Sequence, residues 1–167
     1  YLGRLRRYFP TPLDGVLKFN LVGGRITAPA GQAVPLFERF FVGGIFNIRG
    51  FERNTLGPEI GVPASGDPGA PLSPFNIGGT TQLYLNNELE VPILKAPVNL
   101  RGLLFFDIGN AFGDGERIAL DTMRMSFGVG LRWFSPVGPL RFEYGFPVNP
   151  RAGEESSVFA FTIGNSF

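Results

Sequence analysis

The side chains of this chain that could do chemistry are one arginine in a glycine-rich segment and a few carboxylates in strand-like segments. Arg49 lies in residues 40–51, which read Phe-Phe-Val-Gly-Gly-Ile-Phe-Asn-Ile-Arg-Gly-Phe. A guanidinium presents a planar fork of donors that can bind a carboxylate through two hydrogen bonds and that stays charged when desolvated. A single arginine between glycines and aromatic residues suggests a plug or latch rather than a hinge.

The acidic side chains offer a second candidate chemistry. Glu88 and Glu90 fall on the same face of a predicted strand, and Asp107 falls on the polar face of the next. Two carboxylates can act as general acid and general base. The chain has no histidine and no cysteine, which excludes a His-based triad, thiolate nucleophiles, disulfides and Cys/His zinc sites. Because Arg49 is a simpler partner for these carboxylates, we expect no enzyme, no metal and no cofactor.

Strands must position these residues. Residues 81–93 place aliphatic side chains at most odd positions and polar side chains, including both glutamates, at even positions. A period of two indicates a sheet whose two faces meet unlike surroundings. The same alternation recurs in residues 17–21, 98–111, 123–133, 140–146 and 159–167, and more weakly in residues 2–9. No helical period competes with it, and we predict an antiparallel meander of about seven strands.

Short and long connections alternate strictly between these strands. The longest is an expected loop at about residues 28–79, and a long structureless loop in a compact β protein is most often functional. Transmembrane barrels combine short periplasmic turns with long extracellular loops. The polar faces carry glycine, serine, asparagine and a few opposed charges, which suits a lumen better than the water-exposed face of a β-sandwich. We therefore predict an all-β, antiparallel transmembrane β-barrel, with residues 1–167 as a single barrel segment.

Composition narrows the possible partners and location. The chain has 167 residues and a formal net charge of +1, so it lacks the basic footprint that nucleic-acid binding needs. No apolar run approaches the length of a membrane-spanning helix. The first seven residues lack the apolar segment of a signal peptide. Because the chain begins as if within a strand, we expect it to be a piece of a longer precursor.

Several motifs in combination resemble the family of BamA-type outer-membrane protein insertases, also described as bacterial surface antigen D15-like. Gly43-Gly44 followed by Ile48-Arg49-Gly50-Phe51 is similar to the family signature Gly-Gly…(Val/Ile)-Arg-Gly-(Phe/Tyr). Further matches are residues 56–58, 106–110, 123–126, 133–140 and the closing aromatic strand. The resemblance covers nearly the whole chain. It implies the C-terminal part of a sixteen-stranded barrel that periplasmic POTRA domains precede in the family.

The resemblance also implies that the long loop folds back into the lumen. Its tip would act as a latch formed by Gly43, Gly44, Arg49, Gly50 and Phe51. Arg49 would then meet carboxylates of the barrel wall, and the matching ones are Glu88 and Asp107. Both lie on the polar face by the alternation alone. The same contacts are also consistent with a salt bridge that merely stiffens the barrel, and the two interpretations overlap.

The last strand is the second candidate site. The resemblance implies a lateral gate whose edge opens and templates an incoming strand by β-augmentation, and its closing aromatic residue would serve as a signal in the assembly of the chain itself. The residues concerned are Phe159, Phe161, Ile163, Gly164 and Phe167. The plain alternative is a closing strand that pairs with the first strand of the barrel.

The function implied is outer-membrane protein assembly without covalent chemistry. The protein would fold and insert β-barrel clients in the bacterial outer membrane through strand templating at the gate and local perturbation of the bilayer. Its partners would be unfolded outer-membrane proteins, accessory assembly lipoproteins and outer-membrane lipid, with no nucleic acid. A two-partner-secretion or TamA-like translocation pore of the same superfamily shares the Arg-Gly-(Phe/Tyr) loop, so the motif does not separate the two.

Overall fold

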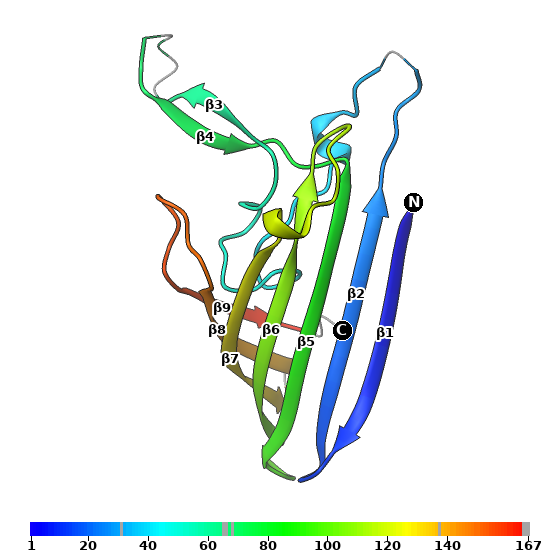
Figure 1. Cartoon of the computed structure of the whole chain (residues 1–167). Helices are drawn as coiled ribbons and strands as arrows, with labels where there is room; N and C mark the ends of the chain where they lie inside the picture. Colours follow the sequence, from blue (N-terminus) through cyan, green and yellow to red (C-terminus); the bar gives the residue numbers. More distant parts are fainter. Residues whose placement is uncertain (31, 65–66, 68, 137, 165–167) are drawn as a thin grey trace.

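The computed structural model describes residues 1–30, 32–64, 67, 69–136 and 138–164. These residues form one antiparallel sheet of seven strands in the order β1-β2-β5-β6-β7-β8-β9 (Figure 1). The strands of this sheet are β1 (Leu2–Thr11), β2 (Gly15–Arg25), β5 (Thr81–Leu94), β6 (Leu100–Phe112), β7 (Arg124–Ser135), β8 (Gly138–Pro147) and β9 (Val158–Ile163). The predicted all-β antiparallel fold of about seven strands is therefore confirmed.

The long connection between β2 and β5 contains more regular structure than its sequence indicates. A hairpin of β3 (Glu59–Pro63) and β4 (Leu72–Asn76) projects away from the sheet, and the short 3₁₀ helix η1 (Leu36–Glu38) precedes it (Figure 1). Each of the two strands is only five residues long and contains proline, which is depleted in strands. Such segments carry little alternation, so residues 28–79 are not one structureless loop.

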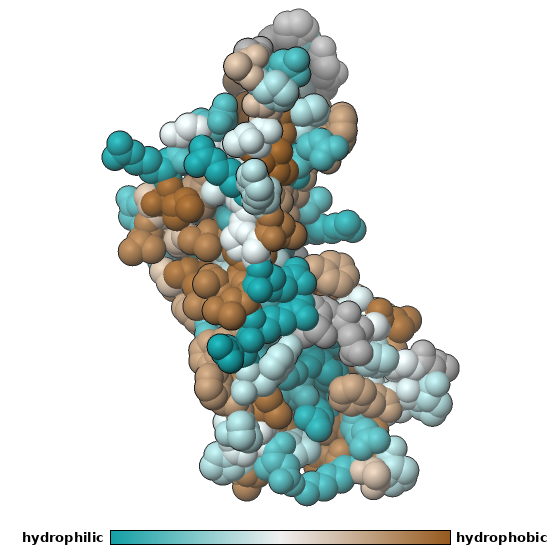
Figure 2. Space-filling view, turned by 90° about the vertical axis from the view of Figure 1, so that its right-hand side faces the viewer, coloured by the Kyte–Doolittle hydropathy of each residue, from teal (hydrophilic) through white to brown (hydrophobic). Residues whose placement is uncertain are grey.

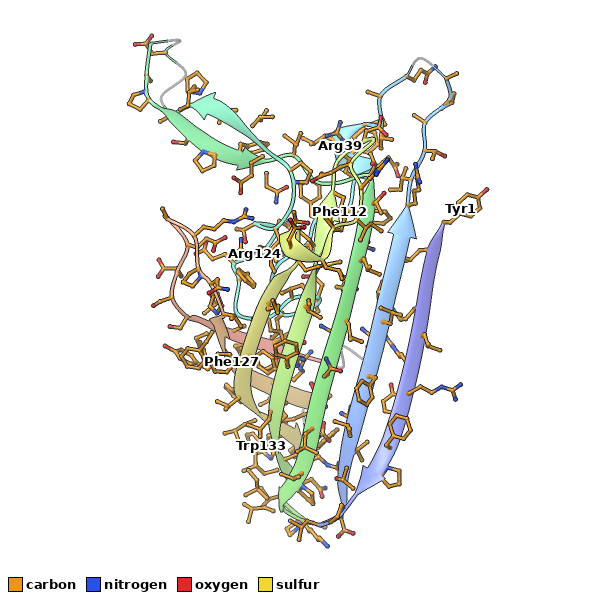
Figure 3. The ribbon with its side chains drawn as sticks, viewed as in Figure 1. Tyr1, Arg39, Phe112, Arg124, Phe127 and Trp133 are labelled. Carbon is orange, nitrogen blue, oxygen red and sulfur yellow. The ribbon has the colours of Figure 1, made fainter. Side chains whose placement is uncertain are left out.

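The two faces of the large sheet differ sharply in chemistry. We call the face that carries Glu88 and Asp107 the inner face, and its buried side chains are largely polar or charged. The opposite, outer face carries exposed apolar side chains such as Phe127 and Trp133 (Figure 3). The connection between β2 and β5 passes behind the sheet in Figure 1 and covers part of the inner face. This covering explains why polar residues of the wall are buried.

The sheet curls so that β8 and β9 lie behind β5, β6 and β7 in Figure 1. In the described residues, β1 and β9 are the two edges and do not pair with each other, so the curled sheet stays open. The described helices, η1 and η2 (Leu120–Thr122), are each three residues long, and no helix of this part of the chain could cross a membrane.

A small apolar core joins the long connection to the inner face. Its buried members come from the connection (Val42, Ile48, Phe51 and Leu56) and from the wall (Val22, Tyr84 and Ala111). Two isolated bridges fix the ends of the inserted part, between Val42 and Leu56 and between Phe40 and Gly79. The segment between Val42 and Leu56 is therefore a closed loop that packs on the wall, and we call it the tip loop.

Candidate functional site

The tip loop is built around glycines that adopt a backbone conformation unfavourable for other residues. Gly43 and Gly44 have φ values of 109° and 105°, a region that glycine enters without steric cost. Asn47 stabilises the turn, because its side-chain oxygen accepts a hydrogen bond of 2.8 Å from the Gly43 backbone N–H. The Gly44 N–H donates to the Ile48 carbonyl at 3.0 Å. This turn directs residues 48–51 towards the inner face of the sheet.

Arg49 is the centre of the contacts between the tip loop and the wall. Its Nε and Nη2 donate to the two oxygens of Asp107 on β6 at 2.8 Å each, which is a bidentate pair. Its backbone N–H also donates to Asp107 Oδ2 at 3.0 Å, and Nη1 donates to Glu88 Oε2 on β5 at 2.7 Å. Arg49 is 3% exposed and Asp107 is 0% exposed. The structure thus brings together the three residues that the sequence analysis paired.

Two further wall residues contact Arg49 that the sequence analysis did not select. Glu143 on β8 places Oε1 at 3.6 Å from Arg49 Nη1. Phe105 on β6 lies beneath the guanidinium, whose Cζ is 3.9 Å from the ring centroid, a cation–π arrangement. Arg49 therefore binds three neighbouring parts of the wall, on β5, β6 and β8.

Glycines on β7 and β8, which have no side chain, leave a recess in the wall that lets the tip loop lie against the strand backbone. A Cβ added at Gly145 would lie 2.6 Å from both Cα and N of Gly50, and one added at Gly128 would lie 2.4 Å from the Phe105 ring. Gly50 itself has a φ of 85° and lies directly over Ser126 and the backbone of β8. Backbone therefore packs against backbone here, which only glycine permits.

A second charged cluster continues from the first along the inner face. Glu90 is bound by Lys18 Nζ at 2.6 Å, by Arg101 Nη1 at 2.9 Å and by Arg132. Lys18 and Arg132 also contact Glu88, each at 3.1 Å. Glu88 therefore links the Arg49 site to a network that spans β2, β5, β6 and β7.

Phe51 connects the tip loop to a loop on the same side of the sheet. The Arg124 guanidinium lies 4.9 Å from the centroid of the buried Phe51 ring, at the upper end of β7 (Figure 3). Glu154 accepts hydrogen bonds of 2.7 and 2.6 Å from Arg124 and one of 2.6 Å from the Arg151 N–H. Partial burial raises the pKa of Glu154, but these hydrogen bonds outweigh it and hold the pKa below its ordinary value.

The candidate gate residues lie at the β9 edge of the sheet. Phe159, Phe161 and Ile163 are exposed on the outer face, and the Phe161 ring lies 5.0 Å from that of Phe142 on β8. Gly164 follows the strand with a φ of 114°. In the described residues β9 pairs only with β8, from Leu140 to Gly145. Phe167 lies outside the described residues.

A cavity of about 610 Å³ lies beside the tip loop and is lined by residues of the loop and of β6, β8 and β9. Its lining includes Arg49 of the tip loop, Phe105 and Glu143 of the wall, and Val158 and Ala160 of β9. The described residues contain no group of acidic side chains arranged to hold a metal ion. In this site a charged loop tip is held by ion pairs against strands of the wall, near the β9 edge of the sheet.

An outward apolar face, a buried charged inner face and an arginine-bearing loop seated on that inner face define a β-barrel membrane protein with an inserted loop. The Omp85 superfamily domain matches residues 3–167. The chain belongs to this superfamily.

Relatives refine this assignment. The chain is 37% identical over 155 residues to outer membrane protein assembly factor BamA from Nitratidesulfovibrio vulgaris, covering 91% of this chain and 18% of the relative. It is 27% identical over 177 residues to BamA from Neisseria meningitidis, covering 88% of this chain and 21% of the relative. The chain thus spans about a fifth of the length of these relatives.

A solved structure agrees with the sequence comparisons. The crystal structure of BamA from Haemophilus ducreyi lacking POTRA domains 1–3 superimposes with a TM-score of 0.76 at 25% identity. The match covers 95% of this chain and 33% of that structure. The predicted resemblance to a BamA-type barrel and the location in the bacterial outer membrane are therefore confirmed, and the residues that the structure describes form an open part of such a barrel.

Proposed function

We propose that this chain is part of an outer-membrane barrel that folds and inserts other β-barrel proteins. Residues 1–167 would form a single barrel segment with the tip loop inside the lumen. Relatives that carry the name outer membrane protein assembly factor support this role. Its partners would be unfolded outer-membrane proteins, accessory assembly lipoproteins and lipid.

The observation that carries the proposal is the seating of Arg49. Arg49 binds carboxylates on β5, β6 and β8, so one side chain holds together the strands that precede the β9 edge. Removing one partner of a buried ion pair is strongly destabilising, at about 3–5 kcal/mol. The seated tip loop would therefore keep the wall rigid up to β8 and leave β9 as the movable element.

The β9 edge is the part of the sheet that would engage a client. A strand edge presents unpaired backbone N–H and C=O groups, which can template another strand. β9 is short and is held by β8 alone in the described residues. Its opening would therefore cost fewer backbone hydrogen bonds than the opening of any longer strand pair of this sheet.

Site-specific photo-crosslinking in the full-length protein tests this proposal. A benzophenone amino acid replaces Phe161 on β9 or, as a matched control, Phe127 on the outer face of β7, and the protein is reconstituted in phospholipid vesicles. An unfolded barrel protein is then added, and its membrane insertion is followed by protease protection. We expect crosslinks to the client from position 161 and not from position 127, together with insertion. Insertion without a crosslink at position 161 would contradict the role of β9.

A translocation pore of the same superfamily is the second candidate. The cavity beside the tip loop favours it, because a passage through the barrel lumen would run along this inner face. A secretion pore would release its client inside the vesicle lumen, whereas an insertase leaves the client in the membrane. Fractionation of the protease-protected client therefore distinguishes the two functions.

A further inference from the structure

Arg7 is a charged residue among apolar side chains of the outer face of the sheet. Arg6 Nε donates to Asn20 Oδ1 on the inner face, so the next residue of β1, Arg7, projects to the opposite face. Its neighbours there are the exposed Leu5 and Phe9 on β1 and Phe19, its partner on β2. Figure 2 views the molecule from the β1 side and shows hydrophilic residues adjoining hydrophobic ones.

The position of Arg7 along β1 places it deep in the membrane. It lies five positions before Pro12 in the short turn between β1 and β2. At about 3.4 Å per residue and a strand tilt of about 40°, this distance corresponds to about 13 Å along the membrane normal. The apolar band of an outer-membrane barrel is about 25 Å tall. Arg7 therefore leaves the wall near the middle of this band, on the half next to the short turns.

Arg7 has no partner on the described part of the protein. None of the hydrogen bonds or ion pairs of the described residues involves it, whereas the acid nearest to its turn, Asp14, binds Lys95 at 2.5 Å. Along the row of cross-strand partners, Phe19 is followed by Asn87, whose amide donates to the Phe106 carbonyl. Pairing of β1 with a further strand would use backbone groups, and the Arg7 side chain would still project from the outer face.

We propose that Arg7 binds the phosphate group of a phospholipid from the leaflet next to the short turns, and draws it with water towards the middle of the bilayer. A guanidinium matches phosphate geometry through two parallel hydrogen bonds. A charged side chain at this depth is relieved by local thinning and water penetration. In the described sheet β1 and β9 are at opposite ends, so the bilayer would be thinned at a place on the wall away from β9. That the lipid bound by Arg7 assists client insertion rests on the proposed function.

Spin-label accessibility tests this inference without any client protein. A nitroxide is attached to Leu21→Cys, on the outer face of β2 beside Arg7, in the full-length protein freed of other cysteines. The protein is reconstituted in vesicles of phosphatidylethanolamine and phosphatidylglycerol, and collision rates with a nickel chelate and with oxygen report local polarity. Val129→Cys on the outer face of β7 is the control label. Arg7→Leu and Arg7→Lys are compared with the unchanged protein.

We expect Arg7→Leu to lower the nickel accessibility at position 21 several-fold and to leave position 129 unchanged, while Arg7→Lys retains most of the effect. Vesicles of an uncharged galactolipid, which has no phosphate, should abolish the difference between the Arg7→Leu variant and the protein that retains Arg7. Unchanged accessibility at position 21 in Arg7→Leu would overturn the proposal, and persistence of the effect in galactolipid would overturn the phosphate assignment. The spin-label measurement contains no client protein, so its result does not depend on whether the protein inserts clients. Failure of the proposed function would be seen only in the insertion assay.

Discussion

Gly145→Ala should lift the tip loop off the wall, because the new methyl group would occupy the place of the loop backbone. The added Cβ would lie 2.6 Å from both Cα and N of Gly50. Neither atom belongs to a flexible side chain, so the clash can be relieved only by movement of backbone. Ordinary contact requires a retreat of the loop by about 0.8 Å.

The magnitude follows from the bonds that this retreat would break. The Arg49 N–H donates to Asp107 at 3.0 Å, and a shift of about 0.8 Å takes it outside hydrogen-bonding range. Overpacking of a tight site costs about 1–3 kcal/mol, and loss of a partner from a buried ion pair costs about 3–5 kcal/mol. We take about 3 kcal/mol, where the two ranges meet, which corresponds to about a 100-fold change in the seating equilibrium.

A buried cysteine beneath the loop provides the assay. Ser126 is fully buried, and a Cβ on Gly50 would lie 3.0 Å from its Cβ, so Ser126 is covered by the loop. Ser126→Cys is nearly isosteric, and this chain has no other cysteine. Maleimide should label the thiol of this variant slowly while the loop is seated. Addition of Gly145→Ala should accelerate the labelling by about 100-fold if labelling follows the open population.

Gly23→Ala is the matched control. It also adds a methyl group to a strand glycine, but the new Cβ would meet its nearest neighbour, Leu83 Cδ1, at an ordinary 3.6 Å. Labelling in this control should stay slow. Equal protection of the thiol in the Gly145→Ala variant would refute the reasoning that backbone contact at Gly50 decides whether the loop is seated.

Three further predictions use the same reporter thiol or a spin label. Asp107→Asn should accelerate the labelling more than Glu143→Gln, because Asp107 binds the loop arginine through both oxygens whereas Glu143 lies at 3.6 Å; the reverse order would contradict the geometry. Phe105→Leu removes a cation–π contact worth about 0.5–2 kcal/mol and should accelerate the labelling less than about 30-fold. The pKa of Glu154 is lowered on folding from an ordinary value of 4.5, so its stabilising contribution is complete above that pH and is lost as the pH falls through the lower folded value. A nitroxide at Ala152→Cys should therefore become mobile in this acidic window, and Glu154→Gln should make it mobile at neutral pH; mobility that is independent of pH in the unchanged protein would contradict the Arg124 contact.

The strands could be predicted from the sequence because each meets lipid on one face and polar groups on the other. Residues 81–93 show this alternation almost without interruption, and the structure extends the strand by one residue, to Leu94. β3 and β4 could not be predicted, since a projecting hairpin buries neither face and its residues carry no alternation. Strands are therefore located in the sequence by the difference between the surroundings of their two faces more than by the strand propensity of their residues.

The site was predictable in part for a similar reason. Glu88 and Asp107 lie on a polar face that local sequence reveals, and the loop motif pointed to Arg49. Glu143 lies on the polar face of its own strand as well, but its approach to Arg49 depends on the curl of the sheet across β7 and β8. The recess at Gly145 depends on where the tip loop lands. Neither feature has a local signal in the sequence.

The most direct test of the account is client insertion by the full-length protein with Arg49→Lys, measured by protease protection in phospholipid vesicles. Lysine keeps the charge but cannot form the bidentate fork that binds Asp107. Arg53→Lys is the control, because Arg53 lies exposed in the same loop. We predict that Arg49→Lys lowers the insertion rate by at least about tenfold, while Arg53→Lys inserts clients at the unchanged rate. Equal rates in both variants would contradict the central claim that seating of Arg49 supports insertion.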